Sequence, residues 1–234
     1  MRLLLALAAT AALLAPPVLA QSGHEHHDHS QHATPMPASG ASDHGDHSSH
    51  GHDVGPAGST HDLRWIDAMV QHHTGALRMS EFVFNVGSPG VGALANTIWS
   101  DQAREIKAMG QWRKAWYPQA PVYPVTLPPG GNPNSLAALR RMSPAQIEAM
   151  QMAGSAPTTE TRVNWFLEGM LEHHGGALQM AHDALRKSNN PTIHRLAREI
   201  IVAQRREIIE LRGMLRHDGF NKPAYYKYDA LFSQ

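Results

Sequence analysis

The sequence predicts an all-α fold: an antiparallel four-helix bundle built from two duplicated helical hairpins, with a disordered N-terminal arm. Apolar residues recur with a helical period beyond Thr60, and proline and glycine divide that region into long segments. A twelve-residue pattern also occurs twice, as MVQHHTGALRMS at residues 69–80 and as MLEHHGGALQMA at residues 170–181. Two hairpins that each carry one apolar face bury those faces most simply against each other.

Four long helices are expected, at about residues 62–84, 88–116, 160–187 and 190–217. Ser88-Pro89 has the form of an N-cap followed by proline in the first helical turn, and Asn190-Pro191 repeats this device at the fourth helix. Pro118 is expected to end the second helix, and Gly219 to end the fourth. The helical region is long enough to bury a core of useful size.

Composition divides the chain into regions. They are a signal peptide at 1–20, a His-rich arm at 21–60, the bundle at 61–218 with hairpins at 61–117 and 157–218 around a connector at 118–156, and a tail at 219–234. The proline- and glycine-rich stretch 118–134 is expected to be irregular. Ser143-Pro144-Ala145-Gln146 has the form of a capping box, which predicts a short helix over residues 144–152. The tail contains tyrosines without a period and is expected to pack as an extended strap.

The start of the chain has the form of a secretory signal peptide. An apolar run from Leu3 to Ala15 follows Met1-Arg2, and Ala20 supplies a small residue for cleavage. The run is shorter than the roughly 20 apolar residues of a transmembrane helix, and no later segment reaches that length. We therefore expect a periplasmic or secreted protein without a transmembrane segment after signal peptide removal.

Charge and cysteine content narrow the function classes. The 20 basic and 20 acidic side chains balance, so there is no electrostatic reason to expect nucleic acid or an anionic membrane as a partner. The chain has no cysteine, which excludes disulfides and thiolate metal ligands. Its 17 histidines supply the available nitrogen donors.

The arm at 21–60 is dominated by Gly, Ser, Pro, Ala, Asp and His and contains almost no large apolar side chain. Such a segment cannot bury enough surface to offset its ordering entropy, so we expect it to be disordered. Its histidines suit loose capture of Cu(II), Zn(II) or Ni(II), and a solubilising linker is the alternative interpretation. These histidines are His24, His26, His27, His29, His32, His44, His47, His50 and His52.

Each copy of the repeat places two thioethers and two imidazoles on one helix face. At about 100° per residue, Met69, His72, His73, Ala76 and Met79 fall within an arc of roughly 120°. The corresponding residues of the second copy are Met170, His173, His174, Ala177 and Met180. Methionines at helical spacing are more often core packing, and buried histidines are more often simply hydrogen-bonded. Recurrence of the whole pattern favours a metal site over packing.

The second helix of each hairpin also repeats, at a shift of 102 positions from Gln102 to Gln204. Its inward stripe carries Glu105 in the first hairpin and Glu207 in the second. A buried carboxylate is costly unless it is paired, so each glutamate is expected either to bind the ion or, preferably, to accept a hydrogen bond from a ligand histidine. Met109 lies on the same stripe and is a further thioether candidate.

Nine further residues of the helical region have structural interpretations. Gly75 and Gly176 lie beside the motif face, where close approach of another backbone would explain glycine inside a helix. Met142, Met150 and Met152 accompany the short helix, and hydrophobic packing is favoured there over a peripheral soft-metal site. The aromatic residues expected as core anchors are Trp99, Trp112, Trp165 and Phe166.

The repeated residues resemble the bacterial family called domain of unknown function 305, which includes CopM-type periplasmic copper-binding proteins. The resemblance covers roughly residues 62–217, and its signature is an M-x-x-H-H-x-x-A-x-x-M helix followed by a Q-x-x-E-I helix. The matching residues are Asp67, Met69, His72, His73, Ala76, Met79, Gln102, Glu105 and Ile106, then Glu168, Met170, His173, His174, Ala177, Met180, Gln204, Glu207 and Ile208. It implies a ferritin-like four-helix bundle and binding of Cu(I) or Ag(I) in copper tolerance. The copies differ where Leu211 stands for Met109 and Glu172 for Gln71.

Two other function classes are weighed against metal binding. Ferritin-like bundles also include di-iron oxidases, which use a Glu-x-x-His motif on two helices. The bundle contains no Glu-x-x-His, and neither Ser-His-Asp nor Cys-His signatures occur, so we expect no enzymatic activity. The remaining alternative is an envelope interaction module without metal.

The hypothesis from the sequence is an exported copper protein that captures, holds or delivers Cu(I), with Ag(I) as a second soft ion. The arm would collect copper and the bundle would hold it, in a periplasmic buffer or chaperone that exchanges copper with another envelope protein. The candidate metal ligands are Met69, His72, His73, Met79, Met109, Met170, His173, His174 and Met180, with Glu105, Glu207, Gln102 and Gln204 as hydrogen-bond partners or additional ligands.

Overall fold

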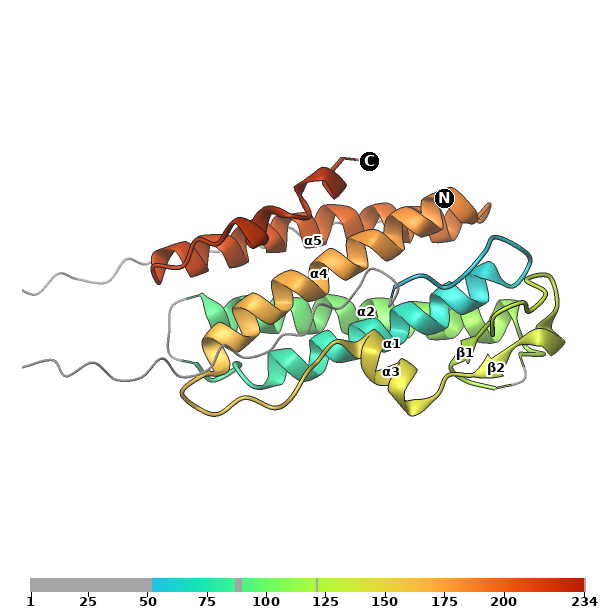
Figure 1. Ribbon diagram of the computed structural model, residues 1–234, viewed down its shortest axis with the longest axis horizontal. Helices are drawn as coiled ribbons and strands as arrows, with labels where there is room; N and C mark the ends of the chain where they lie inside the picture. Colours follow the sequence, from blue (N-terminus) through green and yellow to red (C-terminus); the bar gives the residue numbers. More distant parts are fainter. Residues whose placement is uncertain (1–51, 87–89, 121, 234) are drawn as a thin grey trace, which may run out of the picture. The chain divides into compact units, whose positions relative to one another are not determined.

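A computed structural model of the chain describes residues 52–86, 90–120 and 122–233. The predicted signal peptide, the arm up to residue 51 and the Ser88-Pro89 cap lie outside the described residues, so those expectations stay predictions. Four long helices dominate the rest (Figure 1): α1 (His61–Glu81), α2 (Val91–Trp116), α4 (Arg162–Lys187) and α5 (Pro191–His217). The prediction of an all-α helical bundle is confirmed. Over the described residues, no helix has the length and apolar character that a membrane crossing requires.

The helices are arranged as two hairpins. α1 packs along α2 and α4 packs along α5, and the two hairpins meet mainly where α1 lies against α4 (Figure 1). Trp65 Nε1 near the start of α1 donates a 2.9 Å hydrogen bond to the carbonyl of Met180, late in α4. Met79, late in α1, lies against Gly169, early in α4. The two central helices therefore run in opposite directions across the interface.

α1 is the central element of the described fold. α2, α4, the short helix α3 (Pro144–Gln151) and strand β1 (Val125–Thr126) all pack against it, so most of its residues are buried. Burial on several sides forces its polar residues to find internal partners. Asp67 does so through Arg113, whose Nε lies 2.6 Å from its carboxylate, and through the Val125 amide at 2.9 Å.

The connector contains more regular structure than expected. β1 pairs antiparallel with β2 (Arg140–Arg141), and a single 3-10 turn η1 (Leu136–Ala138) precedes β2. A two-residue ladder is too short to leave a periodic pattern in the sequence. The capping box at Ser143 forms as predicted, because the Gln146 amide donates to Ser143 Oγ and the Ser143 amide donates to Gln146 Oε1.

The C-terminal tail folds as two short 3-10 turns, η2 (Pro223–Tyr226) and η3 (Asp229–Leu231), where an extended strap was expected. It lies along α4. Tyr225 and Lys222 both bind Glu168, and the Tyr228 hydroxyl donates a 2.9 Å hydrogen bond to Glu172. Polar contacts between far-apart residues fix this segment, and the local sequence pattern does not reveal them.

The aromatic core was predicted only in part. Phe166 is fully buried as expected, whereas Trp99 is 36% exposed. Trp112 and Trp165 pack at the margin of the core. The largest fully buried aromatic side chain of the described core is Trp65, which was not among the predicted core anchors.

Candidate metal centre

The four histidines of the repeat are all fully buried at the crossing of α1 and α4. His72 and His173, which occupy the same position in the two copies, have ring centroids 3.8 Å apart. His173 Nε2 also lies 2.9 Å from the carbonyl oxygen of His72, to which it donates. The duplication therefore brings one imidazole from each hairpin into direct contact.

The other two histidines contact carboxylates on the second helix of their own hairpin. His73 Nε2 lies 2.5 Å from Glu105 Oε2 on α2, within hydrogen-bonding geometry. His174 Nε2 lies 2.8 Å from Glu207 Oε2 on α5, at ion-pair distance but without the alignment of a hydrogen bond. A carboxylate on one ring nitrogen orients an imidazole and increases the basicity of its other nitrogen.

Several buried polar atoms at this crossing have no hydrogen-bond partner. His72 lacks partners at both ring nitrogens, and the Nδ1 atoms of His73, His173 and His174 also lack them. An unpaired buried polar group costs about 1–3 kcal/mol, and an unseen ion or water is a common explanation. These buried imidazole nitrogens are therefore available as donors at the crossing of α1 and α4.

Two glutamines beside the histidines add to this polar centre. Gln102 is 3% exposed and both of its amide atoms lack partners, and Gln204 is 2% exposed with an unpaired Oε1. They lie at equivalent positions of α2 and α5. Both hairpins thus contribute the same set of buried polar groups.

Burial also determines the protonation of the central pair. Desolvation, followed by repulsion from the neighbouring imidazoles, holds the pKa of His72 and that of His173 well below the ordinary histidine value. Both rings are neutral at pH 7 for this reason. A neutral imidazole has the lone pair that metal coordination requires.

The predicted thioether ligands share the core with these histidines. Their side chains are 0–1% exposed and belong to the same apolar cluster. The thioethers are Met69, Met79, Met109, Met170 and Met180. A sulfur–imidazole contact that the structure records involves a different methionine, Met152, whose Sδ lies 2.9 Å from His52 Nε2.

His52, predicted as one of the loose ligands of the arm, lies beside this centre. Its ring centroid is 5.5 Å from that of His72, in an edge-to-face arrangement. Gly176 makes room for it, since a Cβ at that position would clash with the His52 ring. The other eight arm histidines lie outside the described residues. No local pattern distinguishes His52 from them.

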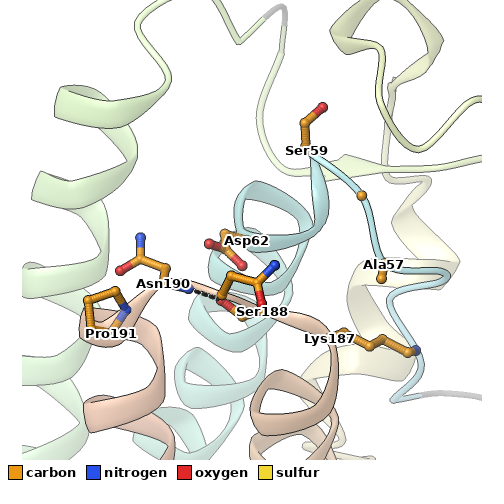
Figure 2. Close-up of a pocket in the computed structure, with 9 residues that line it drawn as sticks. Ala57, Ser59, Asp62, Lys187, Ser188, Asn190 and Pro191 are labelled. Carbon is orange, nitrogen blue, oxygen red and sulfur yellow. Dashed lines mark hydrogen bonds between the residues drawn. The ribbon is translucent and has the colours of Figure 1, made fainter.

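Neither a preformed cluster of His, Cys, Asp or Glu ligands nor the open pocket marks a metal site in the described part of the chain. Within residues 52–86, 90–120 and 122–233, no group of three or more His, Cys, Asp or Glu side chains is placed to hold one ion. An open pocket of about 650 Å³ lies at the end of the bundle, lined by Ser59, Asp62, Lys187, Ser188 and Asn190 among others (Figure 2). No motif residue lines it, so the helix crossing remains the candidate site.

Several solved structures are similar to this chain. A DUF305 protein from Streptomyces coelicolor is 23% identical, with a TM-score of 0.50 over 69% of this chain and 95% of that chain. A DUF305 fragment from Deinococcus radiodurans is 25% identical, with a TM-score of 0.49 over 70% and 99%. The structure of CopM in the Cu(I)-bound form is 26% identical, with a TM-score of 0.49 over 67% and 96%. Among curated proteins, none matches the sequence.

The family model described as "Domain of unknown function (DUF305)" matches residues 62–215, from the first turn of α1 nearly to the end of α5. This match includes both copies of the histidine and methionine repeat and spans more than half of the chain. The chain therefore belongs to the DUF305 family.

Proposed function

We propose that this protein is an exported carrier of soft metal ions that holds copper as Cu(I) at the crossing of α1 and α4. The observation that carries the proposal is the set of fully buried imidazoles with unpartnered ring nitrogens. A packing role would leave these groups satisfied or replace them by apolar side chains. A bound ion accounts for their burial, their neutrality and their duplication together.

The available donors fit a soft monovalent ion. Imidazole and thioether groups suit Cu(I) and Ag(I), whereas oxygen-rich sites suit Mg, Ca and Mn. Methionine needs no deprotonation to act as a ligand, and the two central histidines are already neutral. Glu105 and Glu207 lie behind the outer imidazoles and supply negative charge close to a cation.

The contact between His72 and His173 favours one ion shared by the two hairpins. Rings whose centroids are 3.8 Å apart cannot easily serve two separate cations, because like charges would repel at that distance. Met69 and Met170 each precede one of these histidines by three residues, on the same face of their helix, and their flexible thioethers are the candidates to complete the shell. The ion would then bridge α1 and α4.

Export and the arm complete the proposed role. The signal-like residues 1–20 direct the protein out of the cytoplasm, and the histidines at 24–52 collect copper for the bundle. This proposed role involves no catalytic step. We propose buffering or delivery of copper, with exchange to another copper-handling protein of the envelope.

Anaerobic titration of the mature chain with Cu(I) against a chromophoric chelator tests this proposal. Wild type is expected to compete for copper, and His72→Gln and His173→Gln are each expected to abolish the tight site, because one ion needs both rings. His182→Gln is the matched control, since His182 contacts the Leu231 carbonyl away from the crossing. Undiminished binding by both variants, with circular dichroism unchanged, would refute the bundle site.

A further inference from the structure

Two segments outside the helical repeat converge beside His72. His52 precedes α1 and Met152 follows α3, yet His52 Nε2 and Met152 Sδ lie 2.9 Å apart. The His52 ring also packs edge-to-face against that of His72, with centroids 5.5 Å apart. A nitrogen donor and a sulfur donor therefore meet directly next to the buried histidines.

Glycines on both central helices make this convergence sterically possible. At Gly75 on α1, a Cβ would clash with the backbone of Gln151, the last residue of α3. At Gly176 on α4, a Cβ would clash with the His52 ring. The two glycines occupy the same position of the repeat, and one admits the segment that carries Met152 while the other admits His52.

The backbone of Met152 is itself unusual. It has φ 49° and ψ 23°, the left-handed conformation that normally favours glycine at the end of a helix. A side chain in this region costs about 1 kcal/mol or more, and such residues cluster at functional sites. Gly154, two residues further on, also has a positive φ. This strained position carries the sulfur that contacts His52.

The pair has the chemistry of a soft-metal ligand set. Two donors that bind one ion at about 2.0 and 2.3 Å lie roughly 3.5–4 Å apart. His52 Nε2 and Met152 Sδ are 2.9 Å apart, so they would need to move apart by only roughly 1 Å to admit an ion. His52 and Met152 are both partly exposed, whereas His72 is fully buried. The pair thus stands between solvent and the buried centre.

We propose that His52 and Met152 form a transfer site that takes Cu(I) arriving at the edge of the bundle and passes it to His72. This inference rests on the proposed function, because it assigns the route by which the buried centre is loaded. His52 is the arm histidine nearest to α1 in the sequence, and it contacts both Met152 and His72. Transfer exchanges ligands only: copper stays Cu(I), and no bond of the protein breaks.

Stopped-flow uptake of Cu(I) by the mature full-length chain, from a chromophoric Cu(I) chelator under anaerobic conditions, tests this route. Met152→Leu and His52→Gln are each expected to slow uptake by roughly tenfold or more, since they remove the tethered intermediate ligand. The amount and affinity of copper bound at equilibrium are expected to match wild type. Met150→Leu and His182→Gln, which change the same residue types elsewhere, are expected to take up copper at the wild-type rate.

The outcomes distinguish a failure of the transfer route from a failure of the proposed function. Uptake by Met152→Leu at the wild-type rate overturns the transfer site while leaving copper binding intact. Loss of equilibrium binding in both variants also overturns it, because the pair would then belong to the final site. No uptake by wild type refutes the proposed function and the transfer site with it. Thermal melts of all variants identify any loss that comes from unfolding.

Discussion

Asp67 shows, at the scale of single residues, how a charge is held inside this fold. Its carboxylate is fully buried, and burial alone raises its pKa. Arg113 and the Val125 amide oppose that rise by binding the ionised form. Arg113 also donates to the Val122 carbonyl and covers the Tyr123 ring at 5.0 Å. One buried ion pair therefore ties α1, α2 and the connector together.

Removing the arginine is expected to be costly. Arg113→Met leaves the buried carboxylate of Asp67 without its cation and should lower the free energy of unfolding by about 3–5 kcal/mol. Arg104→Met removes an exposed partner of Asp101 from the same helix and should change it by less than about 0.5 kcal/mol. Urea denaturation followed by circular dichroism measures both. Equal effects would show that the Asp67 pair does not hold the connector.

His61 gives a pH-dependent prediction at the same scale. Burial works to lower its pKa, but contacts with Asp183 and Asp62 outweigh burial and raise it above the ordinary 6.5. Its charged form therefore stabilises the fold below about pH 6.5, and this contribution is lost as pH rises through the raised pKa. His61→Asn should destabilise the protein more at about pH 6 than at about pH 9. Unfolding free energies that differ from wild type equally at both pH values would contradict this assignment.

Single residues also mark what the sequence could predict of the site. Recurrence of the twelve-residue pattern predicted the histidines as candidate ligands. The cost of burying a carboxylate predicted that Glu105 and Glu207 need partners. His52 and Met152 could not be found in this way, because neither lies in a repeat. Their positions depend on how the chain before α1 and the end of α3 pack, which is a tertiary effect.

At the scale of elements, close packing of α3 on α1 brings Met152 to the centre. Gln151 at the end of α3 bonds Arg78 Nη1 at 2.8 Å and Gln71 at 3.2 Å, both on α1. Gly75 lies directly under the Gln151 backbone. The sequence predicted close approach of a backbone at Gly75, and the structure confirms it. At Gly176 that expectation was wrong, because a histidine ring and no backbone fills the space.

A pair of glycine substitutions tests this packing. Gly75→Ala should lower the free energy of unfolding by about 1–3 kcal/mol, because the added methyl group meets immovable backbone. Gly110→Ala, within α2 and with open space at the Cβ position, should raise it by about 0.5–1 kcal/mol through helix propensity alone. Thermal or urea unfolding separates the two. A stable Gly75→Ala protein would mean that α3 does not press against α1.

The elements themselves were predictable to different degrees. Long amphipathic segments with proline and glycine ends predicted the four helices, with α1 ending at Glu81 and α4 beginning at Arg162. The capping box predicted α3. The β1–β2 ladder and the 3-10 turns of the tail are too short to leave a period, and contacts from distant residues determine them.

At the scale of the whole described bundle, the connector and the tail each hydrogen-bond to the same repeat position of one hairpin. Gln71 Nε2 on α1 donates a 3.0 Å hydrogen bond to the hydroxyl of Tyr123 in the connector. Glu172, its counterpart on α4, accepts a 2.9 Å hydrogen bond from Tyr228 in the tail. Connector and tail thus cover equivalent positions of the repeat. An ion at the α1–α4 crossing would add a further tie between the halves.

Metal binding should therefore stabilise the whole bundle. Ag(I), a redox-inert substitute for Cu(I), supplied at about 100 times its dissociation constant should add about 2.7 kcal/mol, or roughly 5–10 °C in melting temperature. A variant with His72→Gln and His173→Gln should lose this shift and keep the helical circular dichroism spectrum. Differential scanning calorimetry of both proteins, with and without Ag(I), checks the prediction. An equal shift in both would place the ion elsewhere.

Anomalous diffraction from crystals of the Ag(I)-loaded protein tests the central claim most directly, because it locates the ion. The account predicts an anomalous peak at the crossing of α1 and α4, within bonding distance of the imidazoles of His72 and His173, with a methionine sulfur as a further ligand. A fully loaded crystal whose peaks all lie away from both imidazoles would contradict it.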